Sequence, residues 1–140
     1  MKRLIAASLL LLTPSAMAIG DTEKAEVIQR CKSQMGQYGA MMVKSCVDQD
    51  LAAYELLQKY DKNAAKVIER CTKQMKEFGW NMVASCTEQD VSAYNELGKY
   101  PEKDRPAVRR CMKQMKEYGW HMVKSCADQD IEAAEALSQY

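Results

Sequence analysis

The chain has 140 residues, of which 47% are hydrophobic and 28% are charged, and its 20 basic residues face 19 acidic ones. This composition excludes a disordered tail and a basic nucleic-acid-binding protein, and the length excludes a multidomain enzyme. A single histidine leaves little for histidine-dependent catalysis, whereas six cysteines and ten methionines are many for a chain of this length.

The first 18 residues have the pattern of a secretory signal peptide. Lys2 and Arg3 precede an apolar run, and residues 16–18 have the small-x-small form that a signal peptidase reads. The apolar run is shorter than the roughly 20 residues that span a bilayer. We expect cleavage after Ala18, which would leave residues 19–140 as a single helical repeat domain with 18 basic and 19 acidic residues. The sequence thus predicts a periplasmic or extracellular protein, with no nucleic-acid partner and no membrane insertion of the mature chain.

The remainder consists of three copies of one 40-residue unit. Residues 21–60, 61–100 and 101–140 align without a gap, and 14 of the 40 positions are identical in all three copies. In the first copy the identical positions are Arg30, Cys31, Gln34, Met35, Gly39, Met42, Val43, Ser45, Cys46, Gln49, Asp50, Ala53, Leu57 and Tyr60. Such a period is typical of tandem repeats that bury their apolar faces against their neighbours.

Each copy is predicted to form two helices joined at a glycine. Ile28, Cys31, Met35 and Tyr38 are spaced three and four residues apart, which is one face of a helix, and good helix formers fill both halves of the unit. Gly39 follows this stripe, as a glycine that ends a helix does. In the first unit we therefore expect a helix at about 23–37 and a second at about 41–58, with the glycine turn between them. In the last unit, Pro106 suits the first turn of the fifth helix.

A second fold remains open at this point. A glycine inside a helix costs only about 1 kcal/mol, so each copy could be one long helix and the chain an antiparallel bundle of three. The two folds differ in how they place the six cysteines, which stand as a Cys-x14-Cys pair in each unit.

The cysteine spacing favours the hairpin. Facing residues in a hairpin have numbers with a constant sum, and the midpoint of Cys31 and Cys46 falls between Tyr38 and Gly39. In one straight helix the two would lie roughly 22 Å apart, too far for a disulfide. Six cysteines in an exported chain imply disulfides. We therefore predict one inside each hairpin, in the pairs Cys31–Cys46, Cys71–Cys86 and Cys111–Cys126.

The same constant sum places polar residues opposite one another. It sets Arg30 near Asp48, Arg70 near Glu88 and Arg110 near Asp128, which predicts an ion pair between the two helices of each unit. It also suggests that Gln34 and Gln49 form hydrogen bonds across the hairpin. The repeated carboxylates Asp50, Asp90 and Asp130 would be costly to bury unpaired. We expect them near an edge or bonded to the next unit.

Methionines flank the cysteines in a palindrome, Cys31-x3-Met35-x6-Met42-x3-Cys46, that all three units share. Thiolates and thioethers select soft ions, so one hypothesis is a Cu(I)-binding protein. Its ligands would be the cysteine pairs with Met35, Met42, Met75, Met82, Met115 and Met122. Paired cysteines of an exported protein form disulfides, however, and methionine fills gaps between helices, so the favoured interpretation has no metal and no cofactor.

Aromatic side chains gather at the three glycines. They are Tyr38, Phe78, Trp80, Tyr118 and Trp120, and stacked units would line them up along one edge. Such an edge could bind a partner peptide or a glycan, although the same residues could simply cap the hairpins. Tyr54, Tyr94 and the tyrosines that end each unit are expected to lie in contacts between units.

No catalytic motif is present in the sequence. The only histidine, His121, occurs in one unit, whereas the nearby Ser125 recurs in units that have no histidine. Cys-x-x-Cys, zinc-ligand and phosphate-loop spacings are all missing. The sequence therefore predicts an all-α repeat protein without enzymatic activity, acting as a binding or scaffold protein. Its partner would be another protein of the cell envelope, or a peptide. The oligomeric state stays open, as does the choice between a solenoid and a compact bundle of hairpins.

Overall fold

The computed structural model describes residues 19–140, and every element in that range is helical. The predicted signal peptide lies outside the described residues. Within them, no helix has both the length and the apolar character needed to cross a membrane.

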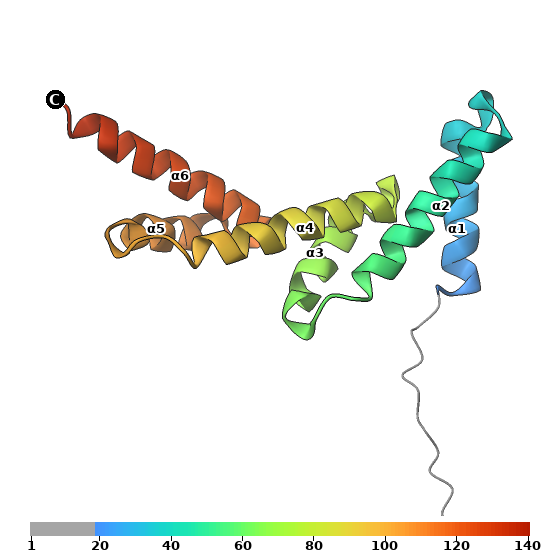
Figure 1. Cartoon of the computed structure of the whole chain (residues 1–140), viewed down its shortest axis with the longest axis horizontal. Helices are drawn as coiled ribbons and strands as arrows, with labels where there is room; N and C mark the ends of the chain where they lie inside the picture. Colours follow the sequence, from blue (N-terminus) through green and yellow to red (C-terminus); the bar gives the residue numbers. More distant parts are fainter. Residues whose placement is uncertain (1–18) are drawn as a thin grey trace, which may run out of the picture.

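Six α-helices follow one another along the chain (Figure 1). They are α1 (Asp21–Met35), α2 (Ala40–Leu57), α3 (Ala65–Met75), α4 (Trp80–Leu97), α5 (Arg105–Met115) and α6 (Trp120–Leu137). Short 3-10 turns, Gly36–Tyr38, Lys76–Phe78 and Lys116–Tyr118, end the first helix of each pair, and Lys62–Ala64 and Glu102–Asp104 lead into α3 and α5. The three hairpins are called unit 1 (21–60), unit 2 (61–100) and unit 3 (101–140).

The glycine between the paired helices is a true break in the chain. Gly39, Gly79 and Gly119 have φ values of 97°, 115° and 117°, a region that side chains with a Cβ rarely adopt. Each reverses the chain between a 3-10 turn and the next helix, so the two helices of a unit run antiparallel. The alternative of three long helices is therefore wrong, because a helix cannot continue through this conformation.

A disulfide joins the two helices of every unit, which confirms the predicted pairing. The bonds are Cys31–Cys46, Cys71–Cys86 and Cys111–Cys126, with Cα atoms 5.8, 5.8 and 5.7 Å apart. In the chain-entropy model each 15-residue loop contributes roughly 3 kcal/mol to stability. Three such bonds, in units too small to hold a core alone, indicate an oxidising compartment.

The units stack in series through their second helices. Helix α2 packs on α4, and α4 packs on α6, so unit 2 touches both neighbours (Figure 1). This order of contacts is that of a short solenoid.

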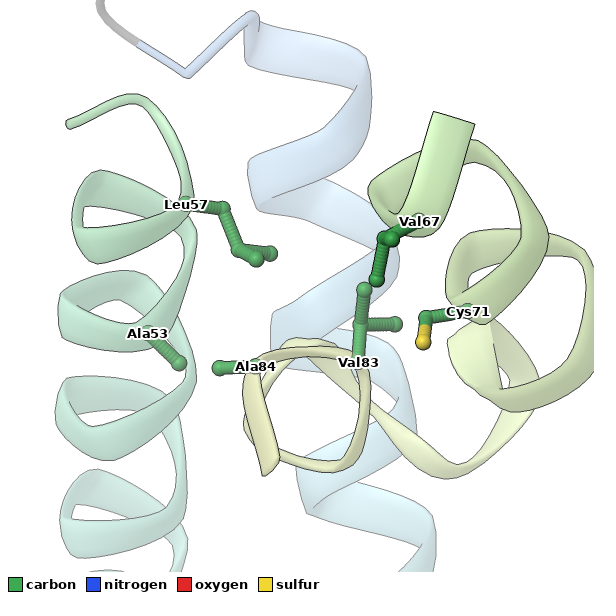
Figure 2. Packing of buried hydrophobic residues seen from close by; sticks show 6 residues of the cluster. All are labelled: Ala53, Leu57, Val67, Cys71, Val83 and Ala84. Atoms are coloured by element: carbon green, nitrogen blue, oxygen red, sulfur yellow. The ribbon is translucent and has the colours of Figure 1, made fainter. Parts of the chain in front are cut away.

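The apolar core follows the same boundaries. Ala53 and Leu57 of α2 point toward Val83 and Ala84 of α4, and Val67 and Cys71 of α3 complete the cluster (Figure 2). A second cluster around Leu97 lies between units 2 and 3; its other buried members are Val108, Cys111, Val123 and Ala127. Each hairpin therefore buries its apolar face partly on itself and partly on the next unit.

Candidate functional site

An arginine–aspartate pair lies beside the disulfide of each unit. In unit 1, Nη2 of Arg30 on α1 donates to Oδ2 of Asp50 on α2 at 2.6 Å. The side chains are 18% and 4% exposed, so the pair is largely removed from solvent. Gln34 accepts a hydrogen bond from Nη1 of the same arginine at 3.0 Å, which holds the guanidinium in place.

The partner predicted for this arginine was wrong. Asp48 lies on the solvent side of α2 and pairs with Lys44 one turn earlier, at 2.5 Å. The constant-sum rule places Cα atoms, whereas the long arginine side chain reaches beyond the residue opposite it. In the same way, Arg70 pairs with Asp90 and not with Glu88, and Arg110 pairs with Asp130 and not with Asp128.

The predicted glutamine bonds across the hairpin are also not formed. Gln34 bonds to Arg30 within its own helix, and Gln49 donates to the Ser45 hydroxyl one turn earlier in α2. On a helix surface, residues four apart are neighbours, and these local partners satisfy both amides.

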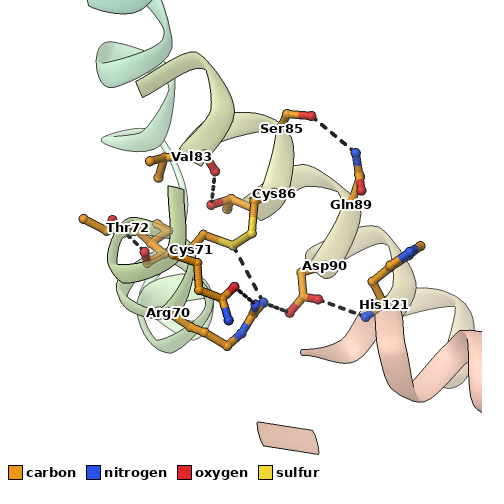
Figure 3. The surroundings of a disulfide bond; sticks show 12 residues. Arg70, Cys71, Thr72, Val83, Ser85, Cys86, Gln89, Asp90 and His121 are labelled. Carbon is orange, nitrogen blue, oxygen red and sulfur yellow. Dashed lines mark hydrogen bonds and ion pairs between the residues drawn. A yellow bond between two sulfur atoms is a disulfide. The ribbon is translucent and has the colours of Figure 1, made fainter. Parts of the chain in front are cut away.

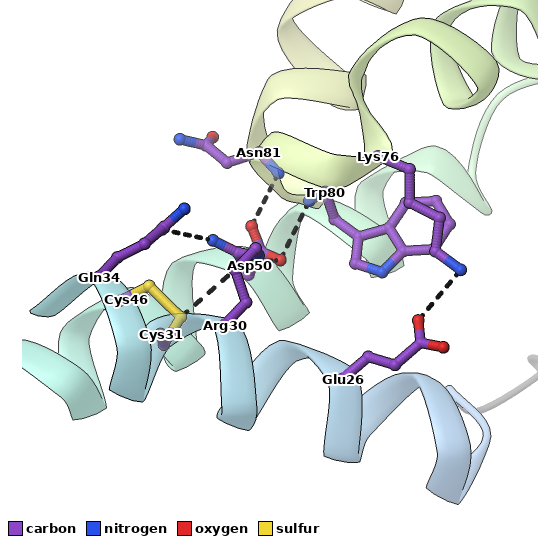
Figure 4. Close-up of polar contacts among 9 residues, drawn as sticks. All are labelled: Glu26, Arg30, Cys31, Gln34, Cys46, Asp50, Lys76, Trp80 and Asn81. Carbon is purple, nitrogen blue, oxygen red and sulfur yellow. Dashed lines mark hydrogen bonds and ion pairs between the residues drawn. A yellow bond between two sulfur atoms is a disulfide. The ribbon is translucent and has the colours of Figure 1, made fainter. Parts of the chain in front are cut away.

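Asp50 has a second role, because it caps the helix of the next unit. Its two carboxylate oxygens accept hydrogen bonds from the backbone N–H groups of Trp80 and Asn81, both at 3.0 Å (Figure 4). These are the first residues of α4, where backbone donors have no partner inside the helix. The residue before them is Gly79, which has no side chain to cap the helix itself. The expectation that Asp50 is bonded to the next unit is thus confirmed.

Gly79 is required at this contact for its small size as well as its backbone. A Cβ placed on it would lie 2.7 Å from Oδ1 of Asp50 and 2.8 Å from the guanidinium carbon of Arg30. The positive φ and the close approach act together, so a side chain here would adopt a strained backbone conformation and displace the paired Arg30 and Asp50 side chains. We call this set of contacts the unit joint: the arginine and aspartate of one unit, and the glycine and helix start of the next.

The joint between units 2 and 3 repeats these contacts (Figure 3). Arg70 pairs with Asp90 at 2.5 Å, and Asp90 accepts from the backbone N–H of His121 at 2.9 Å. A Cβ on Gly119 would again lie 2.7 Å from the aspartate and 2.8 Å from the arginine. The signal for the joint was present in the sequence, since its arginine, aspartate and glycine are among the positions identical in all three units.

Aromatic pairs flank both joints. Tyr54 of α2 meets Trp80 of α4 edge to face, with ring centroids 4.9 Å apart, and Tyr94 meets Trp120 at the same distance. Lys76 has its ammonium 5.5 Å from the centre of the Trp80 ring and also pairs with Glu26 of α1 at 3.1 Å (Figure 4). Tryptophan and tyrosine thus bind neighbouring units together.

The five aromatic residues proposed as one edge separate into two sets. Trp80 and Trp120 are partly buried at the joints, while the hairpin tips carry the well-exposed rings of Tyr38, Phe78 and Tyr118. The sequence did not distinguish these sets, because in units 2 and 3 the exposed ring and the tryptophan are only two residues apart.

A groove opens beside each joint on the side of the first helices. The larger groove, about 820 Å³, lies between units 2 and 3. Its lining includes aromatic, amide and charged side chains, among them Tyr60, Asn63, Lys66, Tyr94, Asn95, Lys116 and Trp120. The smaller, about 410 Å³, is lined by the corresponding part of units 1 and 2, including Glu26, Lys76 and Trp80.

A hydrogen-bonded trio connects units 2 and 3 on another side. Tyr100, the last residue of unit 2, donates its hydroxyl to Asp128 on α6, and Lys124 donates to the same carboxylate at 2.7 Å. Burial, and then the bond to Asp128, raise the pKa of Tyr100 from 10.0 to about 12. Burial would raise the pKa of Asp128, but the bonds from Lys124 and Tyr100 outweigh it and lower that pKa.

The Cys/Met palindromes do not form a thiolate site in this structure. All six cysteine sulfur atoms are in disulfides, which lack the thiolate that binds a soft ion. Among residues 19–140 there is also no cluster of three or more His, Cys, Asp and Glu side chains suited to a metal ion. Met42, Met82 and Met122 are well exposed, and Met35, Met75 and Met115 lie at the edge of the hairpin cores.

His121 uses its backbone, not its ring, at the second joint. The side chain faces a shallow depression between α4 and α6, beside Glu88, Lys124 and Ser125. Ser125 itself accepts a hydrogen bond from Gln129, as its counterparts do in the other units.

Compared with known protein families, curated proteins and solved structures, the chain shows no match.

Proposed function

We propose that this protein is a non-enzymatic binding protein of the periplasm or the extracellular space, and that it holds a peptide segment of a partner protein in the grooves at its unit joints. The observation that carries this proposal is the 820 Å³ groove between units 2 and 3. Its volume lies in the range of about 300–1,000 Å³ that is usual for ligand sites. A smaller groove at the preceding joint gives a partner chain a second point of attachment.

The lining of the larger groove suits a polypeptide. Asn63 and Asn95 carry amides that both donate and accept hydrogen bonds, as a peptide backbone does. Tyr94 and Trp120 offer apolar surface for a side chain of the ligand.

A glycan is favoured less than a peptide. Sugar rings stack on a free aromatic face, but Trp120 already meets the Tyr94 ring and has the Lys116 ammonium 5.7 Å from its centre. Nucleic acid is disfavoured by charge. Arg70 and Asp90 neutralise each other, and the remaining lysines of the groove, Lys66 and Lys116, are matched by Asp61 and Glu117.

The support for a rigid site comes from the joint itself. Disulfides fix each hairpin, and Asp90 fixes the angle between units 2 and 3 through its bond to α6. A preorganised groove loses less entropy when it binds a ligand than a mobile one does. The three disulfides also suit the compartment proposed here.

Site-specific photocrosslinking in living cells tests this proposal. A photoreactive amino acid at Asn95, which is exposed and lines the groove, should capture one defined partner peptide. The same probe at Gln89, which is exposed on another side of α4, is the matched control and should capture none of it. Capture at Gln89 alone would place binding on the other surface and contradict the proposal.

The captured segment can then be synthesised and its affinity measured. The double change Asn63→Ala and Asn95→Ala removes two hydrogen-bonding side chains and should weaken binding about tenfold or more, whereas Gln89→Ala should leave it unchanged. Equal affinities for the double variant and the unchanged protein would show that the groove is not the site.

A further inference from the structure

The two ends of the stack carry the two halves of a unit joint, each without its counterpart. At the C-terminal end, Arg110 and Asp130 are paired as in the other units, but they are 60% and 40% exposed. Leu137 is 70% exposed, although the equivalent Leu57 and Leu97 are only 3% and 5% exposed at the internal joints.

At the N-terminal end, the other half is preformed. Gly39 also has a positive φ, 97°, and no atom of residues 19–140 lies within 4 Å of a Cβ placed on it. Ala40 and Met41, which begin α2, occupy the positions of Trp80 and Asn81 and are exposed. Their backbone N–H groups point out of a helix start that lacks the aspartate of a preceding unit.

The residues that form the arginine–aspartate contacts of the internal joints have counterparts at the two ends. Asp130 corresponds to Asp50 and Asp90, whose carboxylates cap the next helix. Arg110 corresponds to Arg70, which also donates to the carbonyl of Tyr118 at 3.4 Å, and the counterpart of that carbonyl belongs to Tyr38.

The trio seen between units 2 and 3 also has its parts at the ends. Tyr140 corresponds to Tyr100 and is fully exposed. Lys44 and Asp48 correspond to Lys124 and Asp128, and they already form the same pair within α2. Joining the ends would give Tyr140 the acceptor that Tyr100 has.

The aromatic pair is missing from both halves together, and the lysine that lies over its tryptophan is also absent, since Gly36 stands at that position. Ala40 stands where the other units have tryptophan, and Ala134 stands where they have tyrosine. Because both aromatic rings are absent, neither end has a tryptophan or tyrosine at this position without its partner ring. The other contacts of the joint can therefore form without a clash.

We propose that a second copy of this chain docks head to tail on the first: the C-terminal end of one molecule, with Arg110, Asp130, Leu137 and Tyr140, receives the glycine turn and α2 helix start of the next. The second copy is the occupant because it carries, in the required conformation, the backbone that Asp50 and Asp90 bind inside the chain. The contact joins two different surfaces, since each molecule has one end of each kind. A heterologous contact of this sort continues as a filament unless it closes into a ring.

The intermolecular joint is weaker than the internal ones. It lacks the tyrosine–tryptophan pair, and it is not tethered by the chain, so association costs translational and rotational freedom. We expect reversible association, detectable at protein concentrations on the order of 10 µM to 1 mM.

Sedimentation equilibrium of the purified, oxidised protein measures this association. The weight-average mass should rise with concentration, and Asp130→Ala or Tyr140→Ala should each weaken association at least severalfold. Glu132→Ala is the matched control, because Ala52 and Ser92, which hold its position in units 1 and 2, stay exposed at the internal joints. It should leave the mass unchanged.

A change at the opposite end tests the other half. Ala40→Pro removes one of the two backbone donors that Asp130 would bind, the counterpart of the Trp80 N–H, and proline is well tolerated in the first turn of a helix. Circular dichroism should show an intact fold, while association weakens in the same direction as for Asp130→Ala but less, because the Met41 N–H remains. Association that is indifferent to changes at both ends would overturn the proposal.

A gain of affinity provides the strictest test, because misfolding cannot mimic it. The double variant Ala40→Trp with Ala134→Tyr restores the aromatic pair that the internal joints use. It should tighten association about tenfold, and more than the two single changes combined. A mass that stays that of a single chain up to about 1 mM, for both the unchanged protein and this double variant, would refute head-to-tail docking.

Discussion

The aspartate of each joint satisfies two elements with one carboxylate. Asp50 neutralises Arg30 inside its own hairpin and also accepts the first backbone donors of α4. A buried carboxylate is costly unless it is paired and hydrogen-bonded, and here both needs are met. Without this carboxylate, the shielded guanidinium of Arg30 would lose its counterion, and the first backbone N–H groups of α4 would lose their acceptor.

Replacement of this aspartate should therefore lower the free energy of unfolding by more than the loss of one ion pair would. We expect Asp50→Ala to lower the free energy of unfolding by about 3 kcal/mol, through the lost cap and the unpaired arginine. Asp130→Ala is the matched control, since its exposed pair should contribute less than about 1 kcal/mol. Urea unfolding at low protein concentration measures both, and equal losses would contradict the role of the joint.

The joint glycine can be tested by comparison with its free counterpart. Alanine at either Gly39 or Gly79 must adopt an unfavourable backbone conformation, which costs roughly 1–3 kcal/mol. Gly79→Ala also drives a Cβ into Asp50 and Arg30, so it should cost at least about 1 kcal/mol more than Gly39→Ala. Thermal unfolding of the two variants checks this. Equal losses of stability would mean that the joint can accommodate a Cβ at Gly79 without a steric clash.

Tyr100 gives the protein a dependence on alkaline pH. Its pKa is raised in the folded state from 10.0 to about 12, so the folded state favours the protonated phenol. The stability that follows is fully present below pH 10 and is lost as the pH rises toward 12.

The absorbance of the phenolate band during a pH titration measures this shift. Tyr100→Phe should remove a late-ionising tyrosine from the curve, and Asp128→Asn should lower the pKa of Tyr100 by removing the acceptor's charge. A curve unchanged in both variants would show that the trio does not hold the phenol.

At the scale of the helices, the aromatic pairs couple one unit to the next. Tyr54 belongs to α2 and Trp80 to α4, and their rings meet edge to face at 4.9 Å. A double-mutant cycle with Tyr54→Ala and Trp80→Ala should give a coupling energy of about 0.5–1.5 kcal/mol. Additive losses would mean that each ring acts only through the area it buries.

The helical hairpins could be predicted from the sequence because two independent signals agree on each turn. The cysteine midpoint and the glycine fall at the same place, and both constrain the backbone locally. The expectation that Asp50 bonds to the next unit rested on the cost of burying a carboxylate, and it also holds.

Contacts that depend on side-chain reach or on the packing of units could not be predicted in the same way. Arg30 bypasses Asp48 because a long side chain can choose among several carboxylates along a helix, and spacing alone does not rank them. The grooves arise from the angle between units, and no local pattern in the sequence encodes an angle. The aromatic residues beside the glycines separate into buried and exposed sets for the same reason.

At the scale of the whole molecule, stability should be greatest in the middle. Helix α4 packs against α2 on one side and α6 on the other, whereas residues 132–140 at the end of α6 are exposed. Amide hydrogen exchange should therefore be slowest around Val83 and Thr87, which are fully buried, and fastest in the last two turns of α6. Equal protection along α2, α4 and α6 would contradict a serial stack.

The grooves lie between the first helices and the joints, while the second helices make the contacts between units and also contribute residues to the groove lining. The floor of each groove is formed by joint residues such as Arg70 and Asp90, but Asn63 and Asn95 line the larger groove without belonging to the joint, so they can change without disturbing it. A repeat protein built in this way can alter its ligand while keeping its shape.

The glycine and aspartate of the joint have a further consequence for how such a gene can grow. Each unit carries the glycine and helix start of a joint at one side and the arginine and aspartate of a joint at the other. An in-frame duplication of 40 codons therefore creates a new unit that has both halves of the joint. We expect a copy of unit 2 to join the stack most readily, because it has both the tryptophan and the tyrosine of the aromatic pair, and its cysteines are brought together by its own hairpin. Recombination can thus change the number of units, and the internal joints of these three units show which aromatic pair a new joint would gain from a copy of unit 2.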